Sequence, residues 1–113
     1  MELESYTFVL LRRPADAPDL SEEQLDRIQE GHLEFLGRMR DRGAMLVSGP
    51  FENQPDASLR GFSIYRTSIE ETRELLRDDP ALLANRMVAD VFTWWTPKGA
   101  VAFPLASAPS ESS

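Results

Sequence analysis

Apolar residues recur every three or four positions between Ser21 and Gly43, a spacing that predicts an amphipathic helix packed on a core. This apolar stripe consists of Leu25, Ile28, Phe35, Leu36 and Met39. The only histidine of the chain, His32, falls within the stripe, so we expect its side chain to point inward. Ser21 followed by Gln24 predicts a capping box at the start of the helix, and Gly43 predicts a left-handed stop at its end.

Four further segments are rich in the aromatic and branched residues of β-strands: residues 6–11, 45–51, 59–65 and 87–95. A second helix is predicted to begin after Ser68, which opens a Ser-Ile-Glu-Glu capping box. It should end before Asp79, because a residue that precedes proline avoids the helical region. Asp79 can instead cap one further turn from Pro80 to Ala84.

The order of these elements, β-α-β-β-α-β, predicts a ferredoxin-like α+β sandwich. In this fold a four-stranded antiparallel sheet carries both helices on one face. We assign residues 1–99 to a single domain and residues 100–113 to a proline- and serine-rich C-terminal tail. The tail has little apolar periodicity and is expected to fray past Phe103.

The first and last predicted strands are apolar on both faces. In the first strand Phe8 and Leu10 face one side, whereas Val9 and Leu11 face the other. Two helices cover only one face, and a bare apolar face of this size is rare on a soluble monomer. We therefore expect a homodimer, a dimeric α/β barrel, in which a second subunit covers the sheet. The alternative is that the tail from Pro97 to Leu105 folds back over it.

Composition narrows the classes of function. Nineteen acidic residues against twelve basic ones give a net charge of −7, which argues against nucleic acid or an anionic membrane surface as a partner. The chain has no cysteine, no apolar run of membrane-spanning length and no recognisable signal peptide, so we expect a cytoplasmic protein. With 113 residues there is little room for a deep cavity within a single chain, and a sizeable pocket should be lined in part by a partner subunit.

His32 is the first candidate for chemistry. An imidazole can serve as a general acid or base when a carboxylate fixes its tautomer. Asp41 and Glu34 face other sides of the same helix, which leaves Asp79, next to the first helix in a ferredoxin-like sandwich. Each residue also has a structural interpretation. His32 can be a core histidine bonded to a neighbour, and Asp79 can be a routine helix cap.

The other candidates are ligand-binding residues. Arg12 and Arg86 could bind an anionic group, although a solvated surface role is the simpler explanation for both. Trp94 could stack on a ligand or pack in an interface. Ser48 lacks the strand-turn-helix elbow of a hydrolase nucleophile and is retained only as a binding residue. One histidine without cysteine cannot build a usual zinc site, and no glycine-rich phosphate loop occurs, so we expect neither a metal nor another cofactor.

Several short motifs, in the same order and spacing, resemble the YCII-related domain family. They are Gly-His-Leu-Glu-Phe-Leu, Leu-Val-Ser-Gly-Pro-Phe, Leu-Arg-Gly-Phe, Asp-Asp-Pro and Trp-Trp-Thr-Pro-Lys-Gly. The match as a whole covers roughly Tyr6 to Gly99. The resemblance implies small ferredoxin-like proteins that dimerise as α/β barrels, akin to muconolactone isomerases. It also implies a histidine–aspartate pair as the active site, here His32 and Asp79, without implying a particular reaction.

Two functions follow from these observations. In the first, the protein is an acid–base enzyme in which His32 moves a proton on a small cyclic or aromatic molecule, with Asp79 orienting the imidazole. Isomerisation or elimination of this kind needs no cofactor. In the second, the protein is a non-catalytic binding or accessory module whose His32–Asp79 pair is a structural pin. An open pocket that touches His32 favours the first function, and a fully packed imidazole favours the second.

Overall fold

An antiparallel sheet of four strands in the order β2-β3-β1-β4 forms one layer of the molecule. The computed structural model describes residues 1–103. Within them the strands are β1 (Leu3–Arg12), β2 (Met45–Pro50), β3 (Leu59–Tyr65) and β4 (Val88–Pro97). The first strand pairs with both β3 and β4, which is the topology of the predicted ferredoxin-like sandwich.

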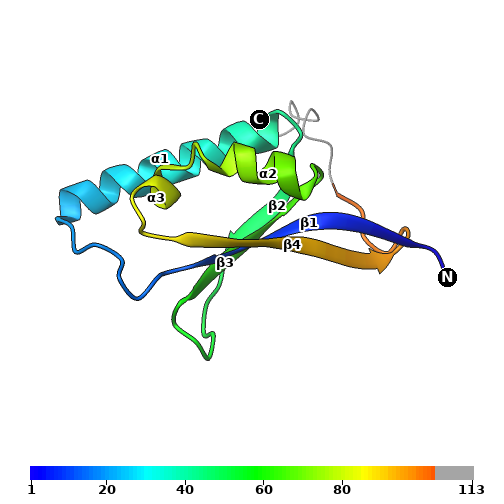
Figure 1. Ribbon diagram of the computed structural model, residues 1–113, viewed down its shortest axis with the longest axis horizontal. Helices are drawn as coiled ribbons and strands as arrows, with labels where there is room; N and C mark the ends of the chain where they lie inside the picture. Colours follow the sequence, from blue (N-terminus) through cyan, green and yellow to red (C-terminus); the bar gives the residue numbers. More distant parts are fainter. Residues whose placement is uncertain (104–113) are drawn as a thin grey trace.

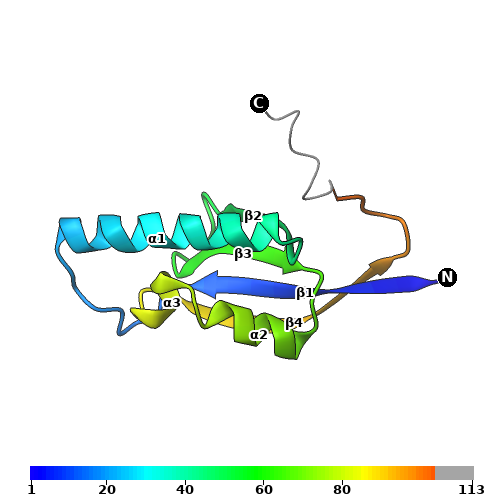
Figure 2. The ribbon, with the colours of Figure 1, turned by 90° about the horizontal axis from the view of Figure 1, so that it is seen from above.

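Helices cover one face of this sheet; Figure 1 shows them as a separate layer, and Figure 2 shows the molecule from above. They are α1 (Glu22–Asp41), α2 (Ile69–Leu76) and the single-turn α3 (Pro80–Leu83). Both predicted capping boxes are present, Ser21 with Gln24 at α1 and Ser68 with Glu71 at α2. These reciprocal bonds satisfy free N–H groups of the first turn. After α1 the chain turns at Gly43, whose φ of 78° is the predicted left-handed stop.

The core lies between the two layers. Alternate residues of β1 point toward the helices, so Val9 is 1% exposed and Leu11 7%. From α1 they meet Phe35 and Met39, two members of the predicted apolar stripe. The remaining buried members of this cluster come from β2, β3, α2, α3 and the flanking turns: Ala44, Met45, Tyr65, Leu76, Ala81 and Met87.

The opposite face of the sheet carries aromatic side chains that contact one another across the strands. We call it the aromatic face; it consists of Tyr6, Phe8, Phe51, Phe62, Phe92 and Trp94. Phe8 is at its centre, with ring centroids 5.1 Å from Phe62 and 5.1 Å from Phe92. Phe92 is still 45% exposed, so the face remains open to solvent in the single chain.

The predicted alternative for this face is a tail folded back over the sheet, and the described part of that segment makes one aromatic contact with the face. Phe103 meets Tyr6 edge to face, with ring centroids 5.3 Å apart. Leu105 and the rest of the predicted tail, residues 104–113, lie outside the described residues.

Two predicted strand boundaries were wrong. The first strand was predicted over residues 6–11 and the last over residues 87–95, but β1 and β4 run on to residues 3 and 97. The reason is continuous pairing, because every residue from Leu3 to Arg12 faces a partner between Pro97 and Val88. Backbone hydrogen bonding thus extends these strands through polar residues of low β-propensity.

Candidate active site

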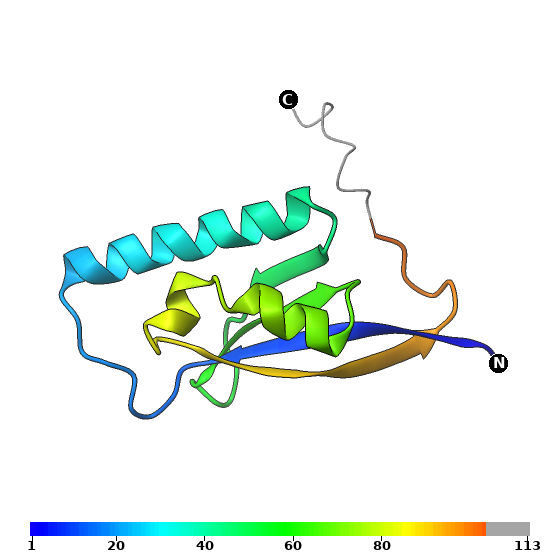
Figure 3. The same cartoon turned by 45° about the horizontal axis from the view of Figure 1, so that its top comes forward.

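His32 lies on the inner side of α1 and is 7% exposed. Its neighbour Gly31 lets α1 approach α3 closely, because a Cβ atom built on Gly31 would lie only 2.8 Å from Cγ of Pro80. Figure 3 shows α3 directly beside the middle of α1. Since Asp79 immediately precedes Pro80, the Gly31–Pro80 contact also brings His32 to Asp79.

Asp79 connects α2 to α3 and is 1% exposed. Its carboxylate oxygens Oδ1 and Oδ2 lie 3.0 Å and 2.9 Å from Nδ1 of His32, so the predicted hydrogen bond is present. Oδ1 also accepts a 3.0 Å hydrogen bond from the backbone N–H of Ala81, which makes Asp79 the predicted N-cap of α3. These bonds hold the carboxylate in place without a lysine or an arginine.

The pair decides which nitrogen of His32 is available for chemistry. A carboxylate accepts hydrogen bonds, so Nδ1 carries a proton and donates it toward Asp79. In the neutral ring Nε2 then holds the free lone pair. This is the arrangement in which an imidazole can take a proton at Nε2 while a carboxylate stabilises the cation that forms.

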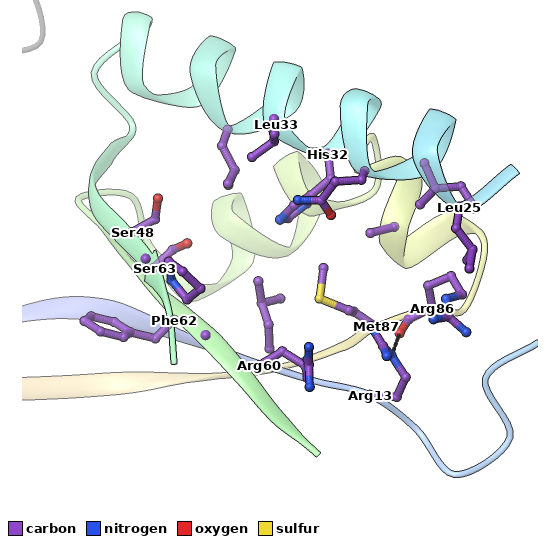
Figure 4. A pocket seen from close by; sticks show the side chains of 18 of the residues that line it. Arg13, Leu25, His32, Leu33, Ser48, Arg60, Phe62, Ser63, Arg86 and Met87 are labelled. Carbon is purple, nitrogen blue, oxygen red and sulfur yellow. Dashed lines mark hydrogen bonds between the residues drawn. The ribbon is translucent and has the colours of Figure 1, made fainter. Parts of the chain in front are cut away.

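His32 lines a cavity of about 510 Å³ between α1 and the sheet. That volume is within the range of small-molecule sites. Figure 4 shows the imidazole extending from α1 into this space, with polar side chains from the sheet and the turns across from it. Most of the wall is apolar, and it includes Leu11, Leu25, Ile28, Leu36 and Met87.

The structure brings together only some of the predicted site residues. Ser48 and Arg86 line the cavity together with His32. Arg12 and Trp94 do not: Arg12 forms a 2.7 Å ion pair with Asp90, and Trp94 packs against Tyr6 on the aromatic face. Both side chains project from the other side of the sheet, because strand residues alternate between its faces.

Two arginines of the cavity were not predicted, Arg13 and Arg60. Arg13 follows Arg12 at the end of β1, so the alternation along the strand offered a signal that one of this pair faces the helices. Arg60 had no such signal, because the pairing of β1 with β3 shifts register at this residue. The pKa of Arg13 is lowered, mainly by burial and further by the positive charges of Arg86 and Arg60.

Tyr65 of β3 is a further polar residue near the pair. It is 0% exposed, and its hydroxyl has no hydrogen-bond partner among residues 1–103. Burial raises the pKa of Tyr65 well above its usual range, and the negative charge of Asp79 adds to the effect. The residue is therefore a neutral phenol that contributes bulk beneath the pair.

Nothing in the described part of the chain points to a metal or a membrane span. Residues 1–103 contain no group of three histidine, cysteine, aspartate or glutamate side chains placed to hold a metal ion. None of the described helices has the length and apolar character needed to cross a bilayer.

Comparison with known proteins shows the fold. No protein-family model matches this chain, and no curated protein does. Among solved structures, it is similar to 5-chloro-2-hydroxyhydroquinone dehydrochlorinase (TftG) from Burkholderia phenoliruptrix AC1100, in complex with 2,5-dihydroxybenzoquinone. The two share 22% sequence identity with a TM-score of 0.50, over 78% of this chain and 92% of that one. At this identity the likeness is one of fold, an α+β ferredoxin-like arrangement.

Proposed function

We propose that this protein is a small-molecule enzyme that uses His32 as a general base and acid, in the manner of an isomerase or lyase. The observation that carries the proposal is an imidazole held at Nδ1 by a buried carboxylate and lining a cavity of about 510 Å³. The sequence resemblance to the YCII-related family supports the same pair of residues. Membership of that family is part of this proposal.

The geometry suggests a role for each residue in the reaction. Nε2 of His32 takes a proton from an activated carbon or hydroxyl of the substrate, and the resulting imidazolium is stabilised by Asp79. Return of the proton to another atom gives isomerisation; loss of a leaving group from the adjacent carbon gives elimination. The apolar wall favours a compact cyclic or aromatic substrate. The dehydrochlorinase with the same fold, solved with a dihydroxybenzoquinone, supports a substrate of this kind.

Proton exchange tests the proposal for isomerisation and elimination alike, because both begin with removal of a proton. A panel of hydroxylated and chlorinated quinols, cyclic enones and lactones is incubated in D₂O, and ¹H NMR follows the loss of carbon-bound protons. We expect exchange or conversion of at least one class, lowered about 10²–10⁴-fold by His32→Asn and to a smaller extent by Asp79→Asn. The matched control is Asp78→Asn, the same change at an exposed neighbour. Equal rates for wild type and His32→Asn would contradict the proposal.

One feature favours a second function: the carboxylate of Asp79 takes part in two separate hydrogen bonds. Because Asp79 holds both His32 and the first turn of α3, the pair can pin α3 to α1 in a non-catalytic ligand-binding module. In that case His32→Asn lowers stability and leaves no activity to lose. A cavity wall at the imidazole makes the enzyme the better supported of the two.

The assembly and its domain limits are part of the proposal. We infer a homodimer formed through the aromatic face, with residues 1–99 as the folding unit and residues 100–113 as an appended tail. Tyr6 contacts Phe103, four residues past this limit. A cytoplasmic location remains the prediction from composition.

A further inference from the structure

Three arginines line the same cavity as His32, on the side opposite the imidazole. They are Arg13 after β1, Arg60 of β3 and Arg86 before β4. Figure 4 shows them across the cavity from His32, which extends from α1. Segments far apart in the sequence therefore deliver three positive charges to one wall of a single cavity.

These charges are not neutralised by neighbouring carboxylates. Among the side chains that line the cavity, Asp26 is the one carboxylate, against three guanidinium groups. The ion pairs within residues 1–103 involve other basic residues, such as Arg12 with Asp90, and none of these three arginines. In a chain with a net charge of −7, these three arginines give one wall of the cavity a local positive charge.

The arginines are oriented by backbone carbonyls, which leaves donors for a ligand. Arg13 donates through Nε to the carbonyl oxygen of Arg86 at 3.2 Å, so its two terminal nitrogens remain available. Arg86 donates through Nη1 to the carbonyl of Pro18 at 2.8 Å, and Arg60 through Nη1 to that of Ala57 at 3.2 Å. The pKa of Arg13 is lowered by its burial and then by the positive charges of Arg86 and Arg60, so both cations lie close enough to act on Arg13.

We propose that Arg13, Arg60 and Arg86 form an anion subsite that binds the carboxylate of the substrate, so that the protein acts on a small organic acid. A planar guanidinium matches a carboxylate through two parallel hydrogen bonds. The apolar wall between the arginines and His32 would hold the carbon skeleton and present its reactive atom to Nε2. This inference rests on the proposed function for its substrate role, whereas the anion subsite itself stands on the arginines.

Titration with matched aromatic probes tests the subsite. Benzoate, its neutral counterpart benzyl alcohol and phenyl phosphate are added to the full chain up to about 10 mM, and binding is followed by ¹⁵N–¹H chemical shifts of the residues around the cavity. We expect benzoate to bind at least tenfold more tightly than benzyl alcohol and to weaken with added salt. Arg60→Met should weaken benzoate about tenfold or more, and Arg60→Lys should restore part of that loss.

Control variants separate this inference from the proposed function. Arg40→Met, at an exposed position of α1 outside the cavity, should leave benzoate binding unchanged. His32→Asn should leave benzoate binding within about twofold, because the subsite consists of the arginines. A wild-type chain that binds benzoate but catalyses no proton exchange would reject the enzyme and keep the subsite. Arg13→Lys is a second test of the subsite at another of its arginines. It is used if a larger substitution of Arg13 unfolds the chain. Equal affinity for benzoate and benzyl alcohol, no benzoate binding, a preference for phenyl phosphate or an Arg60→Met variant that binds like wild type would each overturn the proposal.

Discussion

Asp79 binds two partners at once, the imidazole of His32 and the N–H of Ala81, and the two bonds can be separated by substitution. Asp79→Ala removes both, and we expect it to lower the free energy of unfolding by about 2–4 kcal/mol, since a helix cap is lost and Nδ1 is left without an acceptor. Asp79→Asn can keep the cap and should lower the free energy of unfolding by about 1–2 kcal/mol. Urea denaturation measures both values; equal losses would show that the cap contributes nothing.

A second prediction at the scale of residues concerns the hydroxyl of Tyr65. Because it has no partner among the described residues, Tyr65→Phe should leave the free energy of unfolding unchanged or raise it at neutral pH. The raised pKa of Tyr65 adds an alkaline effect: above about pH 10 the unfolded chain releases this proton while the folded one keeps it, so stability falls as pH rises.

The measurement is a pair of denaturation series between neutral pH and pH 11.5. Relative to Tyr65→Phe, the wild type should lose about 1.4 kcal/mol per pH unit once the unfolded tyrosine is ionised. The other titrating groups are common to both chains and cancel. A loss of more than about 1 kcal/mol in Tyr65→Phe at neutral pH would mean that the hydroxyl is hydrogen-bonded after all.

The residues of the site differ in how far the sequence could predict them. His32 and Asp79 could be placed together because a helical stripe and an Asp-Pro step constrain where each side chain points. Arg12 was predicted as a ligand-binding residue, but the adjacent Arg13 lines the cavity instead. The predicted strand indicated that neighbouring side chains alternate between the faces of the sheet, but not which of them faces the helices. Arg60 could not be found at all, because its position depends on a register shift between β1 and β3, which are distant in the sequence.

At the scale of elements, the crossing of α1 and α3 depends on Gly31. Gly31→Ala gains helix propensity, but its Cβ would lie 2.8 Å from Pro80 and push α3 away. We expect a net loss of about 1–3 kcal/mol of stability and a lower rate in any reaction that uses the His32–Asp79 pair. The matched control is Gly37→Ala in the same helix, where nothing lies within 4 Å, and it should stabilise the protein by about 0.5–1 kcal/mol. Thermal melts of both variants check this, and a stabilised Gly31→Ala would contradict it.

The predictions of secondary structure were correct where they depended on local sequence signals. Helix starts at Ser21 and Ser68 and the stop at Gly43 depend on side-chain to backbone bonds within a few residues, and all three were confirmed. Strand ends depend instead on the partner strand. Leu3 and Pro97 belong to strands because they pair with each other, an interaction between distant parts of the chain that no local pattern contains.

At the scale of the molecule, the two faces of the sheet are unequal. One packs on the helices, while the other presents the aromatic face with Phe92 45% exposed. Aromatic residues are enriched in protein interfaces, where their large surfaces are desolvated. Within residues 1–103, Phe103 contacts this face at Tyr6. A second copy of the chain is the partner that the resemblance to dimeric α/β barrels implies.

The last prediction therefore concerns the oligomeric state. Size-exclusion chromatography with light scattering at micromolar concentration should give about twice the chain mass of 12.8 kDa. Phe92→Lys places a charge within the proposed interface and should yield a folded monomer, because burying an unpaired charge opposes association. Leu83→Lys is the matched control, since Leu83 is 73% exposed on α3, away from the aromatic face, and it should remain dimeric. A wild-type chain that elutes as a monomer would refute the dimer, and a Phe92→Lys variant that stays dimeric would show that the subunits meet through another surface.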